Sequence, residues 1–495
     1  MMTKTPVFTS NCLPNSNVKN PHATRLGKAI ITALAEHPGV SGIHPLADSL
    51  DAFAARYLLC GMAENTLDVQ YYIWQDDMSG RLLFSALLAA ADRGVRVRLL
   101  LDDNNTNGLD DILELLNSHP QIEVRLFNPF SFRLFRAIGY LTDFARLNRR
   151  MHNKSFTVDG ETTIVGGRNV GDAYFGVGKQ PLFSDLDVLA IGPVVAEVSQ
   201  DFQRYWESQC VSTLAKVLDV DAGVLQQWVQ LPDDWRNDPK ARRYLDRLTT
   251  SQFATDLVAR RLNMYWAQTR LLSDDPRKGQ GRAHHHTLLP QRLINVIGLP
   301  KQEIDIISAY FVPTRAGIAQ ILGLVRKGVK IAILTNSLAA NDVAVVHAGY
   351  ARWRKKLLRH GVALYELKPE NNSPRRPRDR GLTGNSGSSL HAKTFSVDKQ
   401  KVFIGSFNFD PRSAMLNTEM GFVIESAALA EDIHQRFTQS QKEAAWALRL
   451  DKWGRVNWVE NRDGKEIIWK KEPHTRFWQR VLVRLVYRLP IEWLL

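Results

Sequence analysis

Cysteine is scarce in this sequence, and long apolar runs are missing. Three cysteines occur among 495 residues, at Cys12, Cys60 and Cys210. Because they are far apart, odd in number and without paired metal-ligand spacing, they argue against a disulfide framework and a zinc site, and favour a reducing compartment. No run of about 18 uninterrupted apolar residues occurs, which argues against a membrane-spanning helix. We also expect no signal peptide, because the first residues lack a charged region followed by an apolar core.

Acidic residues are outnumbered by basic ones. The sequence has 64 lysines and arginines against 51 aspartates and glutamates, which gives a net charge of +13. This excess predicts a polyanionic partner, either nucleic acid or the phosphate surface of an anionic membrane. With 44% hydrophobic and 23% charged residues, the chain has the composition of a folded protein, which excludes disorder and a fibrous repeat.

The chain contains an internal repeat. In each half an alternating apolar segment, typical of a strand, precedes a helical segment, a buried strand after a basic turn, and a further short strand. These segments cover residues 66–74, 80–92, 93–103 and 122–129 in the first half and 303–312, 316–326, 327–337 and 362–369 in the second. The order predicts an α/β fold with a mixed sheet covered by helices, built twice around a pseudo-twofold axis.

The spacing of the repeat sets the expected domain boundaries. Equivalent positions lie roughly 235 to 240 residues apart, so the duplication takes up most of the chain. We expect a first domain at residues 46–211 and a second at 284–450. The remainder is a tail at 1–45, an inter-domain helical segment and loop at 212–283, and a C-terminal extension at 451–495.

Both halves end in the same motif. The first contains MHNKSFTVDGETTIVGGRN and the second LHAKTFSVDKQKVFIGSFN, so each has His-x-Lys, an Asp after four further residues, and a Gly-x-x-Asn element. A lone histidine is usually a structural residue, but two copies of one motif at equivalent places in a repeat favour catalysis. We assign the catalytic motif to His152, Lys154, Asp159, His391, Lys393 and Asp398. We assign substrate binding to Asn169, Ser406 and Asn408.

The motif suits phosphate ester chemistry. In a strand, residues two apart share a face, so one His and one Lys from each half can meet at the pseudo-dyad. The two lysines can neutralise phosphate oxygens, while one imidazole attacks phosphorus and the other protonates the departing alcohol. This scheme needs no metal and no cofactor. Asp159 and Asp398 end their strands ahead of a turn, and we interpret them as structural rather than as proton carriers.

A catalytic histidine needs a third group that fixes its tautomer. Asp185 and Glu419 open apolar strands at equivalent places in the two halves, so we predict that they orient the histidines. Asp187 is an alternative to Asp185 for this role. If it has no such role, we interpret it as a solvated carboxylate at a strand end. Three consecutive histidines at 284–286 do not share a helix face, so we do not expect a metal site there.

The doubled motif resembles the phospholipase D superfamily. The continuations GGRNVGDAYF and GSFNFDPRS carry that resemblance, which covers nearly the whole chain. LDVQYYIWQDD and RMHNKSFTVDG are similar to segments of bacterial cardiolipin synthases, most closely of the branch called C. The sequence departs from the pattern at Lys399, where glycine often follows the Asp. It also has Gly167 where the second copy has Ser406.

The resemblance implies a ping-pong phosphatidyl transfer through a phosphohistidine, with cardiolipin as the product. For this branch it implies phosphatidylethanolamine as donor and phosphatidylglycerol as acceptor. It suggests His152 as the nucleophile and His391 as the acid and base, although the symmetry of the motif leaves this choice open. The expected partners are these phospholipids and a membrane surface rather than nucleic acid. Whether an accessory protein is needed stays open.

The C-terminal sequence RFWQRVLVRLVYRLPIEWLL predicts contact with the membrane. Its arginines recur every four residues between aromatic and aliphatic ones, the pattern of a helix in the bilayer interface. The predicted contact residues are Arg476, Trp478, Arg480, Arg484 and Arg488. A helix packed on the protein body with one basic stripe is the alternative. We expect a peripheral protein on the cytoplasmic face of the inner membrane.

A second aromatic and basic segment, residues 127–151, precedes the first motif. It is interpreted either as a lid or membrane-facing wall of the lipid site or as an ordinary connecting helix. Three other functions remain open from sequence: a hydrolytic phospholipase D, a nuclease of the same superfamily, and a non-catalytic lipid-binding protein. The first shares every catalytic residue and differs only in water exclusion and acceptor affinity.

Overall fold

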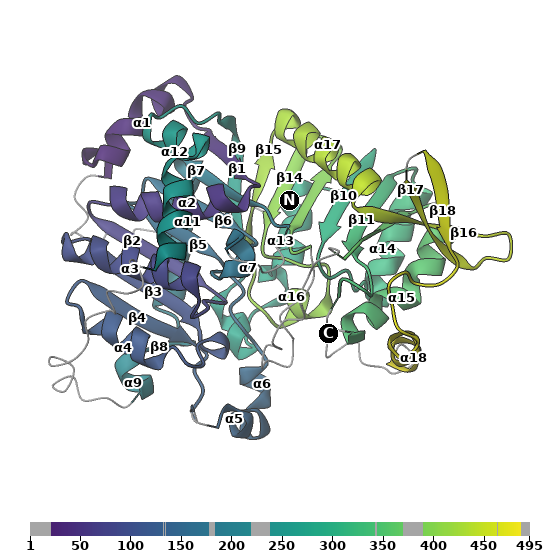
Figure 1. Cartoon of the computed structure of the whole chain (residues 1–495), viewed down its shortest axis with the longest axis horizontal. Helices are drawn as coiled ribbons and strands as arrows, with labels where there is room; N and C mark the ends of the chain where they lie inside the picture. The colour runs from purple at the N-terminus through teal and green to yellow at the C-terminus, as the bar shows by residue number, and fades with distance from the viewer. Residues whose placement is uncertain are drawn as a thin grey trace, which may run out of the picture.

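Two similar halves lie side by side in the computed structural model, each a sheet covered by helices (Figure 1). The structure describes residues 21–131, 133, 135–177, 184–218, 238–341, 344–369, 390–462 and 464–486. Within them, no helix has the length and apolar character needed to span a bilayer.

The first sheet is mixed, in the order β4-β3-β2-β5-β6-β7-β1. β2, β3 and β4 are parallel to one another, the other pairs are antiparallel, and β8 adds to the free edge of β4. The bounds are β1 Ser41–Leu46, β2 Thr66–Tyr71, β3 Arg96–Asp102, β4 Ile122–Phe127, β5 Ser155–Val158, β6 Thr162–Gly166, β7 Asp187–Ile191 and β8 Val211–Thr213.

The second sheet repeats this order as β12-β11-β10-β13-β14-β15-β9, with the same parallel and antiparallel pairs. The bounds are β9 Tyr265–Ser273, β10 Glu303–Ser308, β11 Lys330–Asn336, β12 Ala363–Leu367, β13 Lys393–Val397, β14 Lys401–Gly405 and β15 Met420–Glu425. The predicted twofold α/β architecture is therefore confirmed.

β9 connects the two sheets. Its first residues pair with β1, where Ser41 lies opposite Ala267, and its later residues pair with β15, where Met420 lies opposite Ser273. Apolar side chains from both sheets fill the space where the halves meet, including Val165 from β6. The two halves are consequently one packed unit, with their pseudo-dyad at this contact.

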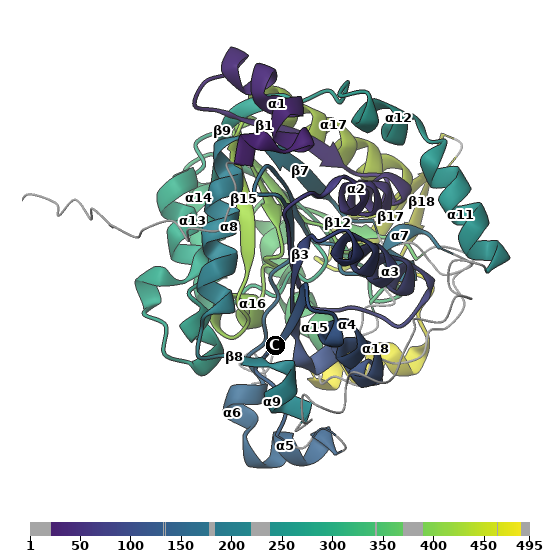
Figure 2. The ribbon, with the colours of Figure 1, turned by 90° about the vertical axis from the view of Figure 1, so that its left-hand side faces the viewer.

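Helices cover the outer faces of the sheets. In the first half, α2 and α3 lie side by side on one face (Figure 2). Asp77 begins α3 by accepting a hydrogen bond from Gly80 N (3.0 Å), as an N-cap residue does. The covering helices are α2 Ser49–Met62, α3 Met78–Asp92, α4 Asp110–Ser118 and α8 Pro193–Trp206, and in the second half α13 Leu289–Ile297, α14 Arg315–Arg326, α15 Ala344–Arg359 and α17 Ala427–Glu443.

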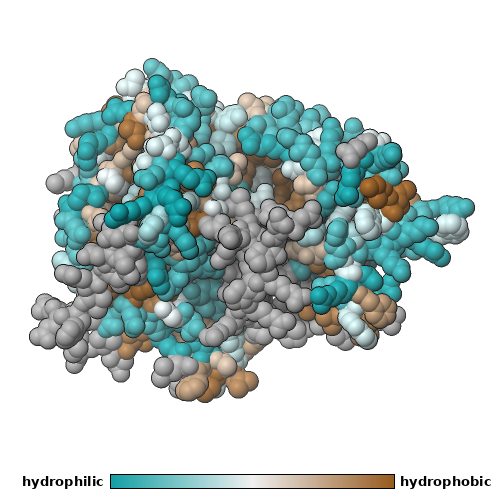
Figure 3. Space-filling model, in the orientation of Figure 1, coloured by the Kyte–Doolittle hydropathy of each residue, from teal (hydrophilic) through white to brown (hydrophobic). Residues whose placement is uncertain are grey.

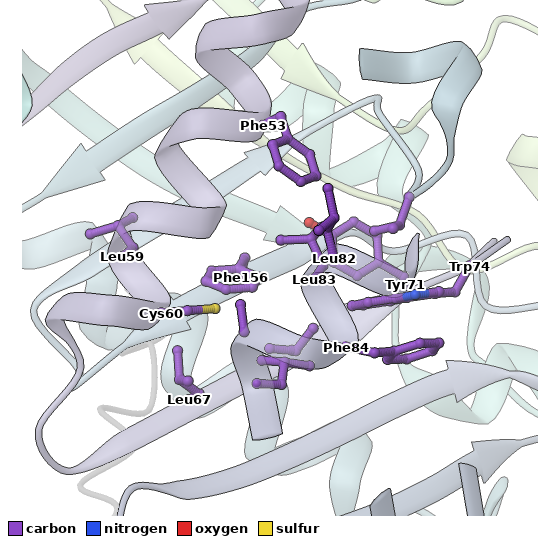
Figure 4. Packing of buried hydrophobic residues seen from close by; sticks show 14 of the residues in the cluster. Phe53, Leu59, Cys60, Leu67, Tyr71, Trp74, Leu82, Leu83, Phe84 and Phe156 are labelled. Carbon is purple, nitrogen blue, oxygen red and sulfur yellow. The ribbon is translucent and has the colours of Figure 1, made fainter. Parts of the chain in front are cut away.

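The core of the first half lies between its sheet and these helices. Figure 4 shows Phe53 and Cys60 of α2, Phe84 of α3 and Phe156 of β5 packed together, and each is at most 1% exposed. The Trp74 and Phe84 rings stack with centroids 4.4 Å apart. Because interiors are close-packed, this core fixes the strand ends that carry the motifs.

The remaining elements complete the fold. They are α1 Arg25–Glu36, α5 Arg136–Thr142, α6 Phe144–Leu147, α7 Asp172–Phe175, α9 Leu214–Leu218, α11 Pro239–Thr249, α12 Gln252–Val258, α16 Pro411–Met415 and α18 Phe477–Val486, with 3-10 turns at Pro21–Ala23, Asp103–Asn105, Pro276–Gln280 and His285–Thr287. β16 Ala445–Leu450, β17 Val456–Arg462 and β18 Lys465–Trp469 widen the second sheet beyond β12. Part of the predicted C-terminal extension is thus sheet.

Candidate active site

The two His-x-Lys motifs lie where the halves meet. His152 donates its backbone N–H to the carbonyl of Thr418 (2.9 Å), and His391 donates its own to Ser184 (2.8 Å). The same segments form isolated parallel bridges. Each motif, at the start of β5 or β13, is therefore fixed to the segment of the opposite half that leads into a carboxylate.

The carboxylates are exchanged between the halves. Nδ1 of His152 lies 2.8 Å from Oε2 of Glu419, and Nδ1 of His391 lies 2.6 Å from Oδ2 of Asp185. Both histidines are 7% exposed, and both carboxylates are buried. Because Nδ1 is engaged, Nε2 is the nitrogen left for chemistry. The structure thus brings the two predicted carboxylates to the histidines, across the repeat rather than within one copy.

Both histidines are neutral, because their pKa values are lowered. Burial, and then the charge of Lys393, lower the pKa of His391 to about 3. Burial, followed by the charges of Lys154 and Lys393, lowers the pKa of His152 well below its ordinary value. Each imidazole therefore has a lone pair available to attack phosphorus or to accept a proton.

The two lysines are buried beside the histidines. Lys154 Nζ donates to the carbonyl of His152 (2.6 Å), and Lys393 Nζ lies 3.0 Å from Nδ1 of His391. Burial lowers the pKa of Lys154 to about 7 and that of Lys393 to about 8. A bound anion would restore their charge, because an opposite charge stabilises the ammonium form. This pair therefore suits a phosphate group.

The carboxylates have different surroundings. Burial raises the pKa of Glu419 to about 7. Burial also acts to raise the pKa of Asp185, but the hydrogen bond from His391 and the charges of Lys393 and Arg168 outweigh it and lower that pKa. The His152 end of the site accordingly has a weakly acidic carboxyl partner, and the His391 end has an ionised one.

Ser406 and Gly167 occupy equivalent positions next to these carboxylates. The Ser406 hydroxyl donates to Oε2 of Glu419 (2.5 Å) and accepts from the Met420 backbone N–H (3.0 Å). At Gly167 a Cβ atom would lie 2.2 Å from Oδ1 of Asp185. The first half thus has glycine where the second has serine. This difference matches the carboxylates, because the shorter side chain of Asp185 leaves no room for a Cβ atom at residue 167.

The two predicted asparagines have unlike contacts. Asn169 accepts from the backbone N–H of Ile73 (3.2 Å) and donates to the Tyr174 hydroxyl (3.0 Å). Asn408 is 5% exposed, and its Oδ1 has no hydrogen-bond partner among the described residues. Asn169 is thus held by its own half, whereas Asn408 keeps an acceptor available.

Asp159 and Asp398 bind backbone amides at the far ends of their strands. Both have a left-handed backbone, with φ of 55° and 53°. Their carboxylates accept from the N–H groups of the residues that lead into β2 and β10, namely Glu64, Asn65 and Thr66 for the first and Lys301, Gln302 and Glu303 for the second. Neither carboxylate is bonded to a catalytic histidine.

Asp187 does not contact a catalytic histidine. It is fully buried and accepts from Arg56 Nη2 (2.7 Å) and the Arg168 backbone N–H (3.1 Å). The sequence interpretation of a solvated strand end is wrong, because this carboxylate neutralises a buried guanidinium inside the first half.

Sequence reasoning missed several neighbours of the histidines. The Tyr72 ring lies edge-on to His152 with centroids 5.0 Å apart, and Tyr174 lies in the same way 5.2 Å from His391. Asp274 accepts from the Glu419 backbone N–H (2.9 Å) and from Lys278 Nζ (2.8 Å). The two tyrosines stand within conspicuous motifs, in LDVQYYIW and GDAYF, but no spacing rule pointed to them.

A cluster of possible metal ligands lies on the second sheet. Glu303, Asp305 and His434 offer ligand atoms within 4.8 Å of one another. His434 Nδ1 already bonds to Oδ2 of Asp305 (2.6 Å), and Lys399 Nζ lies 3.8 Å from Glu303. An ion there would have to compete with both contacts, and the cluster does not include the catalytic histidines.

Known proteins share this architecture. A family model described as "Cardiolipin synthase, PLD-like domain" matches residues 59–206 and 293–441, one copy in each half. Cardiolipin synthase C of Escherichia coli (strain K12) is 69% identical over 95% of this chain and 100% of that protein. Cardiolipin synthase A of Pseudomonas syringae pv. syringae (strain B728a) is 27% identical over 78% of this chain and 66% of that protein.

A solved structure agrees at the level of the fold. The crystal structure of phosphatidylserine synthase from Haemophilus influenzae Rd KW20 aligns with 94% of this chain and 98% of its own, with a TM-score of 0.58. Its sequence is 13% identical, so the likeness concerns the fold alone.

Proposed function

The chain belongs to the family of phospholipase D-like cardiolipin synthases, and from this premise we propose that it transfers a phosphatidyl group to phosphatidylglycerol through a phosphohistidine. The observation that carries the proposal is the exchanged pairing of His152 with Glu419 and of His391 with Asp185 around two buried lysines. It supports the proposal because phosphatidyl transfer of this kind requires a nucleophile, an acid and cations close together.

In the first step, Nε2 of His152 attacks the phosphorus of the donor lipid. The bond from phosphorus to the head-group alcohol breaks, and His391 gives that oxygen its proton. His391 can carry this proton because the negative charge of the bound phosphodiester raises its pKa. Lys154 and Lys393 neutralise the non-bridging oxygens as charge develops there. The products are a phosphatidyl-histidine and the free alcohol.

In the second step the acceptor takes the place of that alcohol. His391, now neutral, removes the proton from a glycerol hydroxyl of phosphatidylglycerol, and the oxygen attacks phosphorus. The bond from phosphorus to His152 breaks, which releases cardiolipin and restores the enzyme. Water in the same place would give phosphatidic acid. The donor we propose is phosphatidylethanolamine, which rests on similarity to the branch named cardiolipin synthase C.

We further propose that the protein binds the cytoplasmic face of the inner membrane through α18. This helix packs on the body through Val483, which contacts Leu338 and Ala348. On its other side, four large apolar side chains are at least 49% exposed, namely Phe477, Trp478, Leu482 and Leu485. Exposed apolar groups on an amphipathic helix are suited to the bilayer interface.

The predicted arginines of this segment have different surroundings. Arg480 is held by the protein, because its Nη1 donates to the carbonyl and the hydroxyl of Thr475. Arg476, directly before α18, and Arg484, on α18, are exposed and can meet lipid phosphates. Arg488 lies outside the described residues.

The segment around α5 presents a second apolar surface. Phe135, Ile138 and Leu141 are 68%, 44% and 87% exposed. α5 and α18 lie on the same side of the molecule, the lower side in both ribbon views (Figures 1 and 2), and the space-filling view shows hydrophobic residues along that side (Figure 3). These exposures favour a membrane-facing wall over a packed connecting helix.

The activity is tested in membranes from a host without its own cardiolipin synthases. Wild-type chain should produce cardiolipin and release ethanolamine, whereas His391→Ala should produce neither. His360→Ala, at an exposed histidine after α15, is the matched control and should behave as wild type. Phosphatidic acid in place of cardiolipin would identify a hydrolase, and no lipid change with any variant would contradict the proposal.

A further inference from the structure

The proposed reaction needs places for two phosphodiesters. The reacting one lies between the histidines and lysines of the two motifs. The acceptor phosphatidylglycerol carries another, which stays intact and is joined to the attacking hydroxyl by a short glycerol chain. An anion so close to a buried site requires a cation, because an uncompensated charge out of water is costly.

Arg412 is a cation next to the site that has no carboxylate of its own. It stands on α16, directly after the GSFN element, and is only partly exposed. Its Nη1 donates to Oδ1 of Asn148 (2.8 Å) and its Nη2 to the carbonyl of the same residue (2.7 Å). In the described part of the chain it forms no ion pair.

Other interior arginines of this protein are neutralised. Arg56, Arg150 and Arg354 each lie within 2.9 Å of a buried carboxylate oxygen. Asp410, two residues before Arg412, attracts its charge but forms no ion pair with it in the described part of the chain. Its Oδ1 accepts from the Ser413 backbone N–H (2.7 Å), and burial raises the pKa of Asp410 to about 7. The charge of Arg412 therefore remains available to a ligand.

Arg412 belongs to the His152 end of the site, because Asn148, which accepts both of its hydrogen bonds, precedes His152 by four residues. Its charge contributes, after burial and the two lysines, to the low pKa of His152, whereas the main influences on the pKa of His391 are burial, Lys393 and Asp185. Arg412 also opposes the rise in the pKa of Tyr72 that burial causes. Tyr72 in turn touches His152, and Lys154 Nζ lies 5.7 Å from the centre of its ring.

The repeat shows that the fold does not need this cation. The first copy has GGRNVGDA where the second has GSFNFDPR, so Ala173 stands in the place of Arg412. Ala173 is 2% exposed on α7, the helix equivalent to α16. One half thus has a methyl group where the other has a guanidinium, which is a further difference between the two ends of the site.

We propose that Arg412 binds the intact phosphodiester of the acceptor lipid. This inference rests on the proposed transferase activity and adds an acceptor subsite to it. A guanidinium recognises phosphate through paired, charge-assisted hydrogen bonds. The subsite selects an anionic acceptor over water and over uncharged alcohols, since only a lipid with its own phosphodiester reaches Arg412.

The experiment compares two acceptors with the purified full-length chain in detergent micelles. The donor is phosphatidylethanolamine labelled in its phosphatidyl part, and the acceptor is either phosphatidylglycerol or free glycerol, which has no phosphate. Arg412→Gln should lower kcat/KM for phosphatidylglycerol by about 10-fold to 100-fold, chiefly through KM, because a charge-assisted bond is lost. Transfer to glycerol should change by less than about 3-fold. Arg412→Lys should recover part of the loss.

The control is Arg93→Gln. Arg93 also donates to backbone carbonyls, those of Ala89 and Cys60, but it lies at the end of α3 on the outer helix layer. It should leave both reactions unchanged, and thermal unfolding should show that every variant is folded. An equal loss with both acceptors would overturn the inference, because Arg412 would then act only by positioning the segment of Asn148 and His152. No loss with either would also overturn it. Wild-type chain that transfers to neither acceptor would instead overturn the transferase proposal.

Discussion

Nδ1 of His391 lies 2.6 Å from Oδ2 of Asp185, although the two residues come from different halves of the chain. Each motif histidine therefore has its carboxylate partner only when the other half is in place, because that carboxylate is supplied across the pseudo-dyad. Neither half alone contains a histidine with its partner. Substitutions that disturb either carboxylate should therefore impair the histidine of the opposite half.

Asp185→Asn should lower turnover by about 100-fold to 10,000-fold. The amide retains the size of aspartate but removes the negative charge that stabilises protonated His391, and its NH2 group favours the wrong tautomer. Lipid transfer assayed with the purified chain measures the loss. Asp432→Asn, on the surface of α17, is the control for loss of one acidic charge. A transfer rate within a few-fold of wild type would contradict the orienting role.

Gly167→Ser should inactivate the enzyme, even though serine is the natural residue at the equivalent Ser406. The new Cβ would lie 2.2 Å from Oδ1 of Asp185, so that carboxylate would have to leave His391. We expect a loss of at least about 100-fold in turnover with the fold retained, as thermal unfolding would verify.

The reciprocal change Ser406→Gly is the matched control. It creates no overlap, and Glu419 can still reach His152, so the loss should stay within about 10-fold. Equal losses from the two changes would show that the hydroxyl, rather than the space beside aspartate, explains the asymmetry of the repeat.

Ser406→Ala should shift the pH dependence of kcat/KM. The Ser406 hydroxyl bond lowers the pKa of Glu419, which burial has raised to about 7. Without it that pKa rises further, so Glu419 becomes protonated at a higher pH and loses its hold on His152 there. The acid limb of the profile should consequently move to higher pH, while the alkaline limb stays. An acid limb that stays or moves to lower pH would argue against Glu419 as the titrating group.

Much of this arrangement could be predicted from the sequence, because it follows from the alternation of apolar residues in strands and from the duplication of the two halves. Alternating apolar residues predicted the strands, and the spacing of His152 from His391 predicted two equivalent α/β halves. The catalytic motif and the two carboxylates were also visible as repeated letters. Their chemical roles stay predictions.

The rest depends on tertiary contacts that no local pattern encodes. The sequence showed Asp185 and Glu419 but not that each serves the opposite half, since this is set by how the sheets pack. It showed glycine at 167 where the second half has Ser406. It did not show that a Cβ atom at 167 would overlap with Asp185, which explains the difference. Arg412 looked like one more basic residue, because only its neighbours reveal that it lacks a carboxylate. Asp187 was misread because its partner Arg56 lies on a distant helix.

Sulfate binding should take up protons near pH 8. Burial lowers the pKa of Lys154 to about 7 and that of Lys393 to about 8, so at pH 8 the first is mostly neutral and the second is half neutral. A bound anion raises both values, and roughly one to one and a half protons should enter with each sulfate. Calorimetry in two buffers with different ionisation enthalpies measures this uptake.

The lysine contribution should vanish at pH 6, where both lysines are charged before sulfate arrives, so any uptake that remains there comes from the histidines, whose pKa values the anion also raises. Lys154→Met should remove most of the uptake at pH 8, whereas Lys399→Met, at a turn on the surface of the second half, should leave it intact. Binding without proton uptake at pH 8 would mean that the lysines are charged in the free enzyme.

Trp478→Ser should weaken binding to vesicles that contain phosphatidylglycerol. The Trp478 side chain is 74% exposed on α18, so its loss removes little from the folded core and should leave thermal unfolding unchanged. In the bilayer interface the same ring would be buried, and burying an aromatic side chain is worth about 1.5–3 kcal/mol, so vesicle affinity should fall about 10-fold or more.

The control is Trp453→Ser in the turn between β16 and β17, where the ring is 66% exposed but not on α5 or α18. Because the two tryptophans are similarly exposed, a general affinity of tryptophan for lipid would make both changes equal. A loss confined to Trp478 identifies α18 as the contact, while equal losses would place the membrane-binding surface elsewhere.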